Sequence, residues 1–249
     1  MGSYQTFASV YDMYMDNVPY KLWSQHIIDI LKQHDISDGL IWELGCGTGK
    51  MTRLLCEAGY DMIGIDNSVE MLSIAMEHQL PESSILYLFQ DMREFELYGT
   101  VQAVISVCDS MNYILSAEEL LSVMQLVNNY LDPAGLFIFD MNTIYKYESL
   151  LADGTFAENR EEGSFIWENE YDVNTMENRY ELTLYIQSED NLYERYYEEH
   201  IQKAYSKEMI ENLLQKAGFE LLSMIDANTN QEVTDKTERI LYTAKKKKK

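Results

Sequence analysis

In the first 145 residues, short apolar runs alternate with stretches whose apolar residues recur every three or four positions. The spacing i, i+3, i+4 and i+7 predicts a helix with one buried face, and continuous apolar runs predict strands covered on both faces. The predicted helices are Pro19–His34, Met51–Ala58, Ser68–Met76 and Ser116–Leu131. The predicted strands are Leu40–Leu44, Asp61–Asp66, Ile85–Gln90, Ala103–Cys108 and Gly135–Met141. This alternation indicates βαβ units and a parallel sheet.

The pattern changes between Tyr145 and Tyr205, where polar and apolar residues alternate with a period of two. Clusters of Asn, Asp, Ser and Glu separate three such runs, which are Phe165–Val173, Asn178–Gln187 and Asn191–Gln202. Runs of this kind predict an antiparallel β meander. A helix at Ser206–Lys216, closed by Gly218, and two strands at Phe219–Ile225 and Arg239–Lys245 follow. We therefore expect one domain over residues 1–249, with residues 145–205 inserted as an antiparallel lid or substrate subdomain.

Three glycines stand at alternate positions where the first predicted strand meets the next helix, in IWELGCGTGKMT (Ile41–Thr52). Glycine at this density indicates a sharp turn or the close approach of a ligand. Acidic residues lie at the ends of three predicted strands, at Glu43, Asp66 and Asp91. Open α/β sheets bind ligands beyond the carboxyl ends of their strands, so these residues predict a site for a nucleoside-containing ligand. The dinucleotide fingerprint would need a glycine at Lys50.

These motifs resemble those of class I S-adenosylmethionine-dependent methyltransferases, small-molecule branch. The matching stretches are Glu43–Gly49, Gly64–Ser68, Gln90–Met92, Leu131–Asp140 and Glu198–Phe219. The resemblance covers nearly the whole chain, most weakly over Tyr145–Asn191. It implies an α/β, Rossmann-like, seven-stranded and mostly parallel sheet with helices on both faces, and S-adenosylmethionine as cofactor. The chain departs from the family at DPAG (Asp132–Gly135), where a Pro-Gly-Gly turn is frequent, and this affects only the rim of the fold.

The resemblance also implies roles for individual residues. Gly45 and Gly47 would let the backbone approach the methionine part and ribose of the cofactor, and Asp66 would accept hydrogen bonds from both ribose hydroxyls. Asp91 would accept a hydrogen bond from the adenine amino group, and Cys108, at the end of the fourth strand, would present its carbonyl to the cofactor's amino group. The implied cofactor-binding set is Tyr11, Glu43, Gly45, Cys46, Gly47, Asp66, Asn67, Asp91, Met92 and Cys108.

Candidates for acceptor binding lie in three segments. Tyr4 and Phe7 belong to an N-terminal segment that folds over the cofactor in the family, although they could instead attach the first helix to the sheet. Asn112 and Tyr113 follow the fourth strand with Asp109 and Ser110, where ordinary turn chemistry is the alternative. His200 shares one face of the last meander strand with four neighbours, Glu194, Tyr196, Glu198 and Gln202, and its alternative role is structural.

Methyl transfer is an in-line displacement that needs alignment, desolvation and a nucleophile with a free lone pair. An amine acceptor needs only to arrive deprotonated, helped by a nearby acid or His. The sequence therefore assigns no catalytic residue. It shows no metal-ligand cluster, and its three cysteines contain no C-x-x-C pair, so we expect neither a metal nor a disulfide framework.

The chain carries 19 basic and 42 acidic residues, a formal net charge of −23. Such a charge repels a phosphate backbone and argues against nucleic-acid partners. No apolar run reaches the roughly 18 residues of a membrane span, and the N-terminus lacks a signal-peptide pattern. We therefore expect a cytoplasmic protein that does not bind membranes.

Residues 145–205 contain 15 acidic and five basic residues, so this segment supplies −10 of the net charge. Seven tyrosines are interspersed from Tyr171 onward. Acids and aromatic faces together favour a cationic or amine-bearing acceptor. The alternative is a solvated acidic surface over a tyrosine-rich contact in a homodimer.

The sequence thus predicts a methyltransferase that acts at N or O of a small molecule. Methyl transfer to RNA or protein, and a non-catalytic S-adenosylmethionine sensor, stay open as alternatives. A nicotinamide oxidoreductase is disfavoured by Lys50 in the glycine fingerprint.

Overall fold

The computed structural model of this chain describes residues 8–79, 83, 85–188 and 192–248. Its helices are α1 (Ala8–Tyr14), α2 (Tyr20–Gln33), α3 (Lys50–Glu57), α4 (Val69–Glu77), the 3-10 helix η1 (Ser110–Tyr113), α5 (Ala117–Tyr130), the π-helix η2 (Lys146–Leu151) and α6 (Lys207–Lys216). Its strands are β1 (Leu40–Leu44), β2 (Asp61–Asp66), β3 (Leu86–Phe89), β4 (Val101–Ser106), β5 (Leu131–Asn142), β6 (Thr155–Asn159), β7 (Gly163–Asp172), β8 (Glu177–Gln187), β9 (Tyr193–Lys203), β10 (Phe219–Asp226) and β11 (Arg239–Lys246).

Seven strands form the main sheet, in the order β10-β11-β5-β4-β1-β2-β3. Strands β1 to β5 pair in parallel, whereas β11 pairs antiparallel with both β5 and β10. This arrangement confirms the predicted Rossmann-like fold class. The chain fills the β2–β3 side of β1 first and then continues at β4 on its other side, so the switch in strand order lies between β1 and β4. Ligands of open α/β sheets bind at such a switch point.

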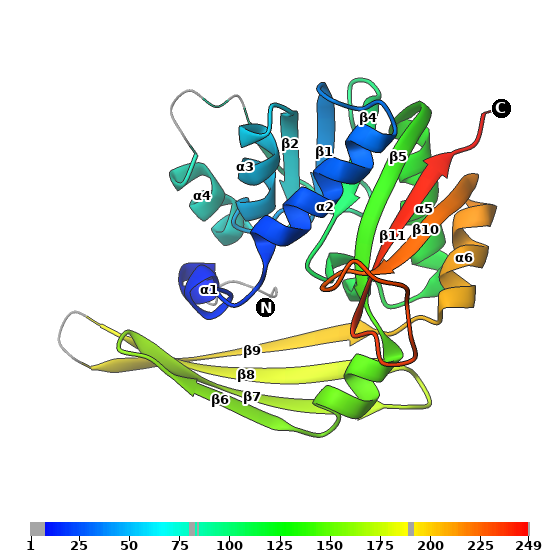
Figure 1. Ribbon diagram of the computed structural model, residues 1–249. Helices are drawn as coiled ribbons and strands as arrows, with labels where there is room; N and C mark the ends of the chain where they lie inside the picture. The colour runs from blue at the N-terminus through cyan, green and yellow to red at the C-terminus, as the bar shows by residue number, and fades with distance from the viewer. Residues whose placement is uncertain (1–7, 80–82, 84, 189–191, 249) are drawn as a thin grey trace.

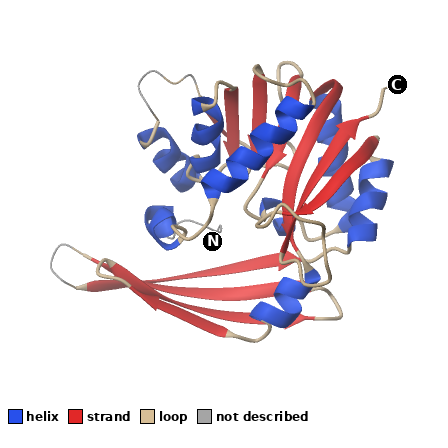
Figure 2. Ribbon diagram, viewed as in Figure 1, coloured by secondary structure: helices blue, strands red, loops and turns tan. Residues whose placement is uncertain are grey.

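Helices cover both faces of this sheet (Figures 1 and 2). Side chains of a strand point alternately to its two faces, and β1 shows the consequence. Trp42 and Leu44 are buried among apolar residues of α5 and α6, whereas Ile41 is buried with apolar residues of α2 and α3. The ring of Trp42 meets that of Phe95 at 4.5 Å between centroids. The apolar runs of the central strands β1, β4 and β5 are therefore buried on both faces, whereas the edge strand β3 is partly exposed.

Serine side chains begin three of the helices as N-caps. Ser68, Ser116 and Ser206 accept hydrogen bonds from backbone N–H groups of the first turns of α4, α5 and α6. A cap of this kind stabilises a helix by about 1 kcal/mol. These starts were predicted from sequence because capping is a local interaction.

The end of α5 differs from the prediction. The expected helix included Leu131, followed by a turn at Asp132–Gly135. Instead, Leu131 has extended dihedral angles, with φ −81° and ψ 143°, and begins β5. Ala134 then takes φ 67°, where the pairing of β4 with β5 shifts register between Val101 and Ala103. An irregular strand thus replaces the predicted turn.

The inserted segment forms a separate antiparallel sheet in the order β6-β7-β8-β9, which lies across from the main sheet (Figure 1). Four strands are present where three were predicted. The missed strand, β6, is five residues long, pairs with β7 at the edge of the sheet and exposes alternate residues. A short polar edge strand carries little of the apolar signal from which strands are predicted. The preceding π-helix, η2, was also missed.

The buried amide of Asn112 joins the two sheets. Its Oδ1 accepts a hydrogen bond of 2.9 Å from the backbone N–H of Asn142, at the end of β5. Its Nδ2 donates to the carbonyl of Lys203, at the end of β9, over 2.8 Å. One side chain thus satisfies backbone groups of both sheets.

We expect the substitution Asn112→Ala to lower the free energy of unfolding by about 2–4 kcal/mol, because each buried polar group left without a partner costs about 1–3 kcal/mol. Urea unfolding measures the change. The matched control is Asn228→Ala, since Asn228 is exposed and its loss should change stability by less than about 0.5 kcal/mol. Equal effects of the two substitutions would contradict this role of Asn112.

Candidate active site

A cavity of about 260 Å³ lies at the switch point of the main sheet. Small-molecule sites usually start near roughly 300 Å³, so its size is close to that lower limit. Every residue of the cofactor-binding set implied by the sequence lines it, and so does Tyr113. These residues come from five separate segments of the chain. The resemblance assigned them to one cofactor, and in the structure they surround a single cavity.

The glycine loop forms one wall of the cavity, and its three glycines have φ between 53° and 73°, a region that favours glycine. A Cβ atom added at Gly45 would lie 2.7 Å from Ser110 Oγ, whereas one added at Gly47 would meet no described atom within 4 Å. Gly45 thus permits close packing of the loop on η1. Gly47, in contrast, leaves open space at the cavity, where a ligand can approach the backbone.

Asp66 holds the glycine loop from the end of β2. Its Oδ2 accepts a hydrogen bond from Gly47 N–H at 2.8 Å, and its Oδ1 accepts one from Ser68 N–H at 2.9 Å. Burial raises the pKa of the Asp66 carboxyl, and the backbone donors act against that rise. The carboxylate therefore sits in a fixed orientation at the cavity wall.

Glu43 lies in β1, just before the glycine loop, and is 1% exposed. Thr52, in α3, donates a short hydrogen bond to its Oε2. Burial raises the pKa of the Glu43 carboxyl to about 8, and the nearby Asp66 adds to the shift. At neutral pH most of this carboxyl is therefore protonated.

Asp91 has a partner that the sequence analysis did not identify. The Arg93 side chain forms hydrogen bonds with both carboxylate oxygens of Asp91, from Nε at 3.0 and 3.1 Å and from Nη2 at 2.5 Å. The Arg93 guanidinium holds the pKa of Asp91 below its usual range. An adenine amino group would have to share or replace this contact. The two residues are two positions apart, so the sequence contained the signal.

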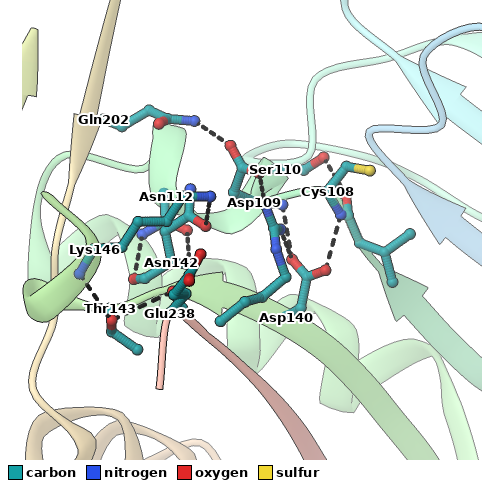
Figure 3. A network of polar contacts seen from close by, with 12 residues as sticks. Cys108, Asp109, Ser110, Asn112, Asp140, Asn142, Thr143, Lys146, Gln202 and Glu238 are labelled. Atoms are coloured by element: carbon teal, nitrogen blue, oxygen red, sulfur yellow. Dashed lines mark hydrogen bonds and ion pairs between the residues drawn. The ribbon is translucent and has the colours of Figure 1, made fainter. Parts of the chain in front are cut away.

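The loop after β4 also lines the cavity, and one detail of it differs from the prediction. Strand β4 ends at Ser106, and Cys108 lies beyond its end with φ 58°, followed by Asp109 with φ 54°. Two consecutive residues other than glycine in this region are costly. The carboxylate of Asp140 accepts hydrogen bonds from both of their N–H groups, at 3.0 and 2.7 Å (Figure 3).

Arg239, from β11, completes this buried network. Its Nη1 lies 2.9 Å from Asp140 Oδ1, and its Nη2 donates to Asp109 Oδ1. The other oxygen of Asp109 accepts a hydrogen bond of 2.6 Å from Gln202 Nε2 on β9 (Figure 3). The cavity loop is thus attached to the four-stranded sheet. No sequence pattern indicated Arg239, whose partners are distant along the chain.

Helix α1 covers the cavity with Tyr11. Burial raises the pKa of the Tyr11 hydroxyl. Asp12 accepts a hydrogen bond of 2.8 Å from Thr48 Oγ1 in the glycine loop, and Arg160 donates to the carboxylate of Asp16 at 2.8 Å. The helical end of the N-terminal segment is therefore attached to the glycine loop and to the loop between β6 and β7.

The five candidates for acceptor binding differ in their placement. Tyr113 lines the cavity, and its hydroxyl lies 2.9 Å from Tyr180 Oη and 3.0 Å from His200 Nδ1. His200 is 1% exposed and Asn112 is fully buried, so both lie behind the wall. Tyr4 and Phe7 fall outside the described residues.

Other lining residues were not predicted from the sequence to line the site, among them Tyr20, Thr48 and Lys50. Lys50 Nζ lies 4.9 Å from the centroid of the Tyr20 ring, and the Tyr20 hydroxyl lies 3.3 Å from Cys108 Sγ. Tyr20 lies within the predicted helix Pro19–His34, and the helix pattern alone gave no sign of this polar contact. Thr48 and Lys50 lie within the glycine motif itself, where Thr48 was not interpreted and Lys50 was used only as an argument against a dinucleotide site.

In the part of the chain that the structure describes, no group of three or more His, Cys, Asp or Glu side chains is placed to hold a metal ion. The helices of that part include none with the length and apolar character needed to cross a bilayer.

A glycine loop and strand-end carboxylates at the switch point of a parallel sheet define an α/β protein that binds a nucleoside cofactor. Comparisons with known proteins give the family. Residues 41–135 match the family model described as a methyltransferase domain. The chain is 33% identical to the proposed methyltransferase YqeM of Bacillus subtilis (strain 168), over 98% of both chains.

Among solved structures, an S-adenosylmethionine-dependent methyltransferase from Clostridium acetobutylicum ATCC 824 superimposes with a TM-score of 0.88. It is 30% identical, and the match covers 99% of this chain and 100% of that one. A sequence relative from Streptomyces venezuelae, dTDP-3-amino-3,4,6-trideoxy-alpha-D-glucopyranose N,N-dimethyltransferase, is 26% identical over 53% of this chain and 56% of its own. The chain belongs to the S-adenosylmethionine-dependent methyltransferase family.

The protein is therefore a methyltransferase with S-adenosylmethionine as its cofactor, and the cavity suits that molecule. Glu43, Asp66 and Asp91 line it, whereas the guanidinium of Arg93 is paired with Asp91. Glu43 is mostly protonated at neutral pH, and Lys50 also lines the cavity, so the described lining has neither a large net charge nor a cluster of free cations for phosphate groups. A nucleoside without phosphate groups fits such a lining. The open space at Gly47 adds room for close approach to the backbone.

We expect the substitution Glu43→Gln to make the protein less sensitive to pH. With a pKa of about 8, the folded protein keeps a proton on Glu43 that the unfolded chain loses near the ordinary pKa of 4.5. Stability from this group is thus highest at low pH and falls as the pH rises from about 5 to 8, with a limiting slope of about 1.4 kcal/mol per pH unit. The variant should gain stability relative to the wild type over this range, by a few kcal/mol.

Urea unfolding at pH 5, 6, 7 and 8 measures this difference. The matched control is Glu77→Gln, because Glu77 is exposed at the end of α4. The free energy of unfolding of this variant should change with pH in the same way as that of the wild type. A stability difference between Glu43→Gln and the wild type that is constant across these pH values would contradict the assigned pKa.

Proposed function

We propose that this methyltransferase transfers the methyl group to nitrogen or oxygen of a small molecule, and that the acceptor bears an amine. The observation that carries the proposal is the enclosure of the cavity. Helix α1 and the four-stranded sheet are both attached to the loops that line it, through Thr48 and Asp12 on one side and through Gln202 and Asp109 on the other. Cover on both sides of the cofactor cavity suits a small acceptor better than a macromolecule.

We further propose that residues 145–205 act as the lid and substrate subdomain. This segment supplies −10 of the net charge of −23, and its strand β8 places Tyr180 beside the cavity residue Tyr113. Acidic and aromatic groups attract cations. The relative from Streptomyces venezuelae, whose name describes an amino sugar as its substrate, supports the same class of acceptor.

The roles of the cofactor-binding residues are part of the proposal. Asp66 would bind the ribose hydroxyls and Asp91 the adenine amino group, while Gly45 and Gly47 admit the methionine part and ribose. These roles are supported by the fact that all residues of the cofactor-binding set line one cavity. Tyr113 would contact the acceptor, whereas His200 would act through Tyr113. The cytoplasmic location and the homodimer stay predictions.

An RNA acceptor is the second candidate that the family permits, and the net charge of −23 argues against it, because RNA binding relies on basic surfaces. A sensor that binds the cofactor without turnover would show no product with any acceptor.

Isothermal titration calorimetry with S-adenosylhomocysteine tests the cofactor roles. We expect micromolar binding by the wild type and a 10- to 100-fold loss with Asp66→Ala, because a hydrogen bond to a charged group contributes about 1.5–3 kcal/mol. The control is Asp61→Ala, since Asp61 is exposed at the start of β2 and its loss should leave the affinity unchanged. Undiminished binding by Asp66→Ala would refute the role of Asp66 at the ribose.

Release of S-adenosylhomocysteine with a panel of acceptors tests the acceptor class. The panel contains amino-sugar nucleotides, simple amines, the corresponding hydroxyl compounds and unmodified transfer RNA. We expect turnover with members of the amine set, and mass spectrometry of the product should show a gain of one methyl group. Turnover with transfer RNA alone would overturn the proposal of a small-molecule acceptor.

A further inference from the structure

Three polar side chains contact one another in series, from the cavity wall into the interior of the protein. Tyr113 lines the cavity, and its hydroxyl lies 3.0 Å from Nδ1 of His200. On the other side of the imidazole ring, Nε2 lies 3.3 Å from Oε2 of Glu198. A phenol, an imidazole and a carboxylate are thus connected in that order.

The interior part of this chain is shielded from solvent. The side chains of His200 and Glu198 are 0% and 5% exposed. The imidazole stacks on the ring of Tyr180, with centroids 4.6 Å apart and planes within 10°. Alternate residues of a strand share a face, so β9 directs Glu198 and His200 to the same side, and the pairing of Tyr180 with His200 places their rings together.

Burial alone would also suit a structural histidine, but the order of the groups indicates proton transfer. A histidine whose one nitrogen meets a hydroxyl and whose other nitrogen meets a carboxylate has the arrangement of nucleophile, base and orienting acid used in general-base catalysis. The hydroxyl here belongs to a residue of the cavity wall. A phenol both donates and accepts at one oxygen, so it can take up one proton while it gives up another.

We propose that Tyr113, His200 and Glu198 form a relay that removes the acceptor's proton, an inference that rests on the proposed small-molecule acceptor. The acceptor's lone pair forms the new bond to the methyl carbon, and the electrons of the broken carbon–sulfur bond go to sulfur. The proton leaves the acceptor atom for Tyr113 Oη, and the phenolic proton moves to His200 Nδ1. The Glu198 carboxylate stabilises the imidazolium. Tyr113 is the catalytic residue, while His200 and Glu198 act through it.

The charged and titratable groups around His200 agree with this direction of transfer. Glu198 comes from the same strand, Tyr180 from β8 and Tyr113 from η1. Farther along the same face of β9, Gln202 contacts Asp109, which pairs with Arg239. A carboxylate beside the imidazole stabilises its protonated form, as a proton-accepting group requires.

The pH dependence of turnover distinguishes a relay from a structural role. At pH 7 we expect His200→Asn to lower kcat with an amine acceptor about 100-fold, within the range of general-base contributions. The deficit should disappear as the pH exceeds the acceptor's own pKa, because the amine then arrives deprotonated. Affinity for S-adenosylhomocysteine should change less than about twofold. A deficit that stays constant with pH would overturn the relay.

Two further variants sharpen the kinetic comparison. Tyr113→Phe should show the same convergence at high pH, because it removes the group that meets the acceptor. The control is His34→Asn, since His34 follows α2, outside the set of cavity-lining residues described, and its profile should match that of the wild type.

The tautomer of His200 provides a test that needs no acceptor. The chain has four histidines, so ¹⁵N NMR of the full-length protein with S-adenosylhomocysteine resolves His200, and His200→Asn assigns its signals. We expect the neutral form of the ring to carry its proton on Nε2, and a shift of the Nδ1 resonance in Tyr113→Phe. A proton on Nδ1, or no response to Tyr113→Phe, would refute the relay. If the expected tautomer is found but no amine is methylated, the amine acceptor is refuted and the relay is retained for a hydroxyl acceptor.

Discussion

The buried ion pair between Asp140 and Arg239 holds together the elements that meet at the cavity. Asp140 is 1% exposed, and its Oδ1 lies 2.9 Å from Arg239 Nη1. The same carboxylate accepts hydrogen bonds from the N–H groups of Cys108 and Asp109, which both have a left-handed backbone conformation. That conformation costs roughly 1–2 kcal/mol for each residue, and hydrogen bonds to a carboxylate can offset it. The loop beside the cofactor therefore depends on a charge at the end of β5, which burial would otherwise disfavour.

This network also explains how the four-stranded sheet is positioned. Asp109 uses one carboxylate oxygen for Arg239 and the other for Gln202 on β9. Two residues earlier on the same face of β9, His200 contacts Tyr113, which follows Asp109 on η1. The loop after β4 therefore meets the cofactor cavity on one side and the inserted sheet on the other. Gln202 and His200 belong to the same strand, and their partners Asp109 and Tyr113 belong to the same loop after β4. A displacement of the inserted sheet would therefore reach the cavity wall directly.

The parts of the protein that were predictable from sequence are those determined by neighbours along the chain. The parallel strands, the helices that begin at serine and the sharp turn at the glycines all depend on local patterns, and the structure contains each of them. The strand β6 was missed because a short polar edge strand depends on its partner, and Leu131 was placed in a helix that it does not join. Arg239 pairs with Asp140 across 99 positions, a relation that no local pattern contains. Arg93, only two positions from Asp91, is different, because that pair could have been recognised.

The same distinction separates the cofactor half of the site from the acceptor half. The methyltransferase family model covers residues 41–135, which contain every residue of the implied cofactor-binding set except Tyr11. The segment 145–205 lies outside that match, and its contacts with η1 join residues 67 and 87 positions apart. Family membership therefore determines the cofactor but leaves the acceptor open. Tyr180 and His200 contact the cavity residue Tyr113, and Gln202 contacts Asp109 in the loop after β4, so a change in the inserted sheet can reach both Tyr113 and that loop. The acceptor of a member of this family thus has to be inferred from such long-range contacts.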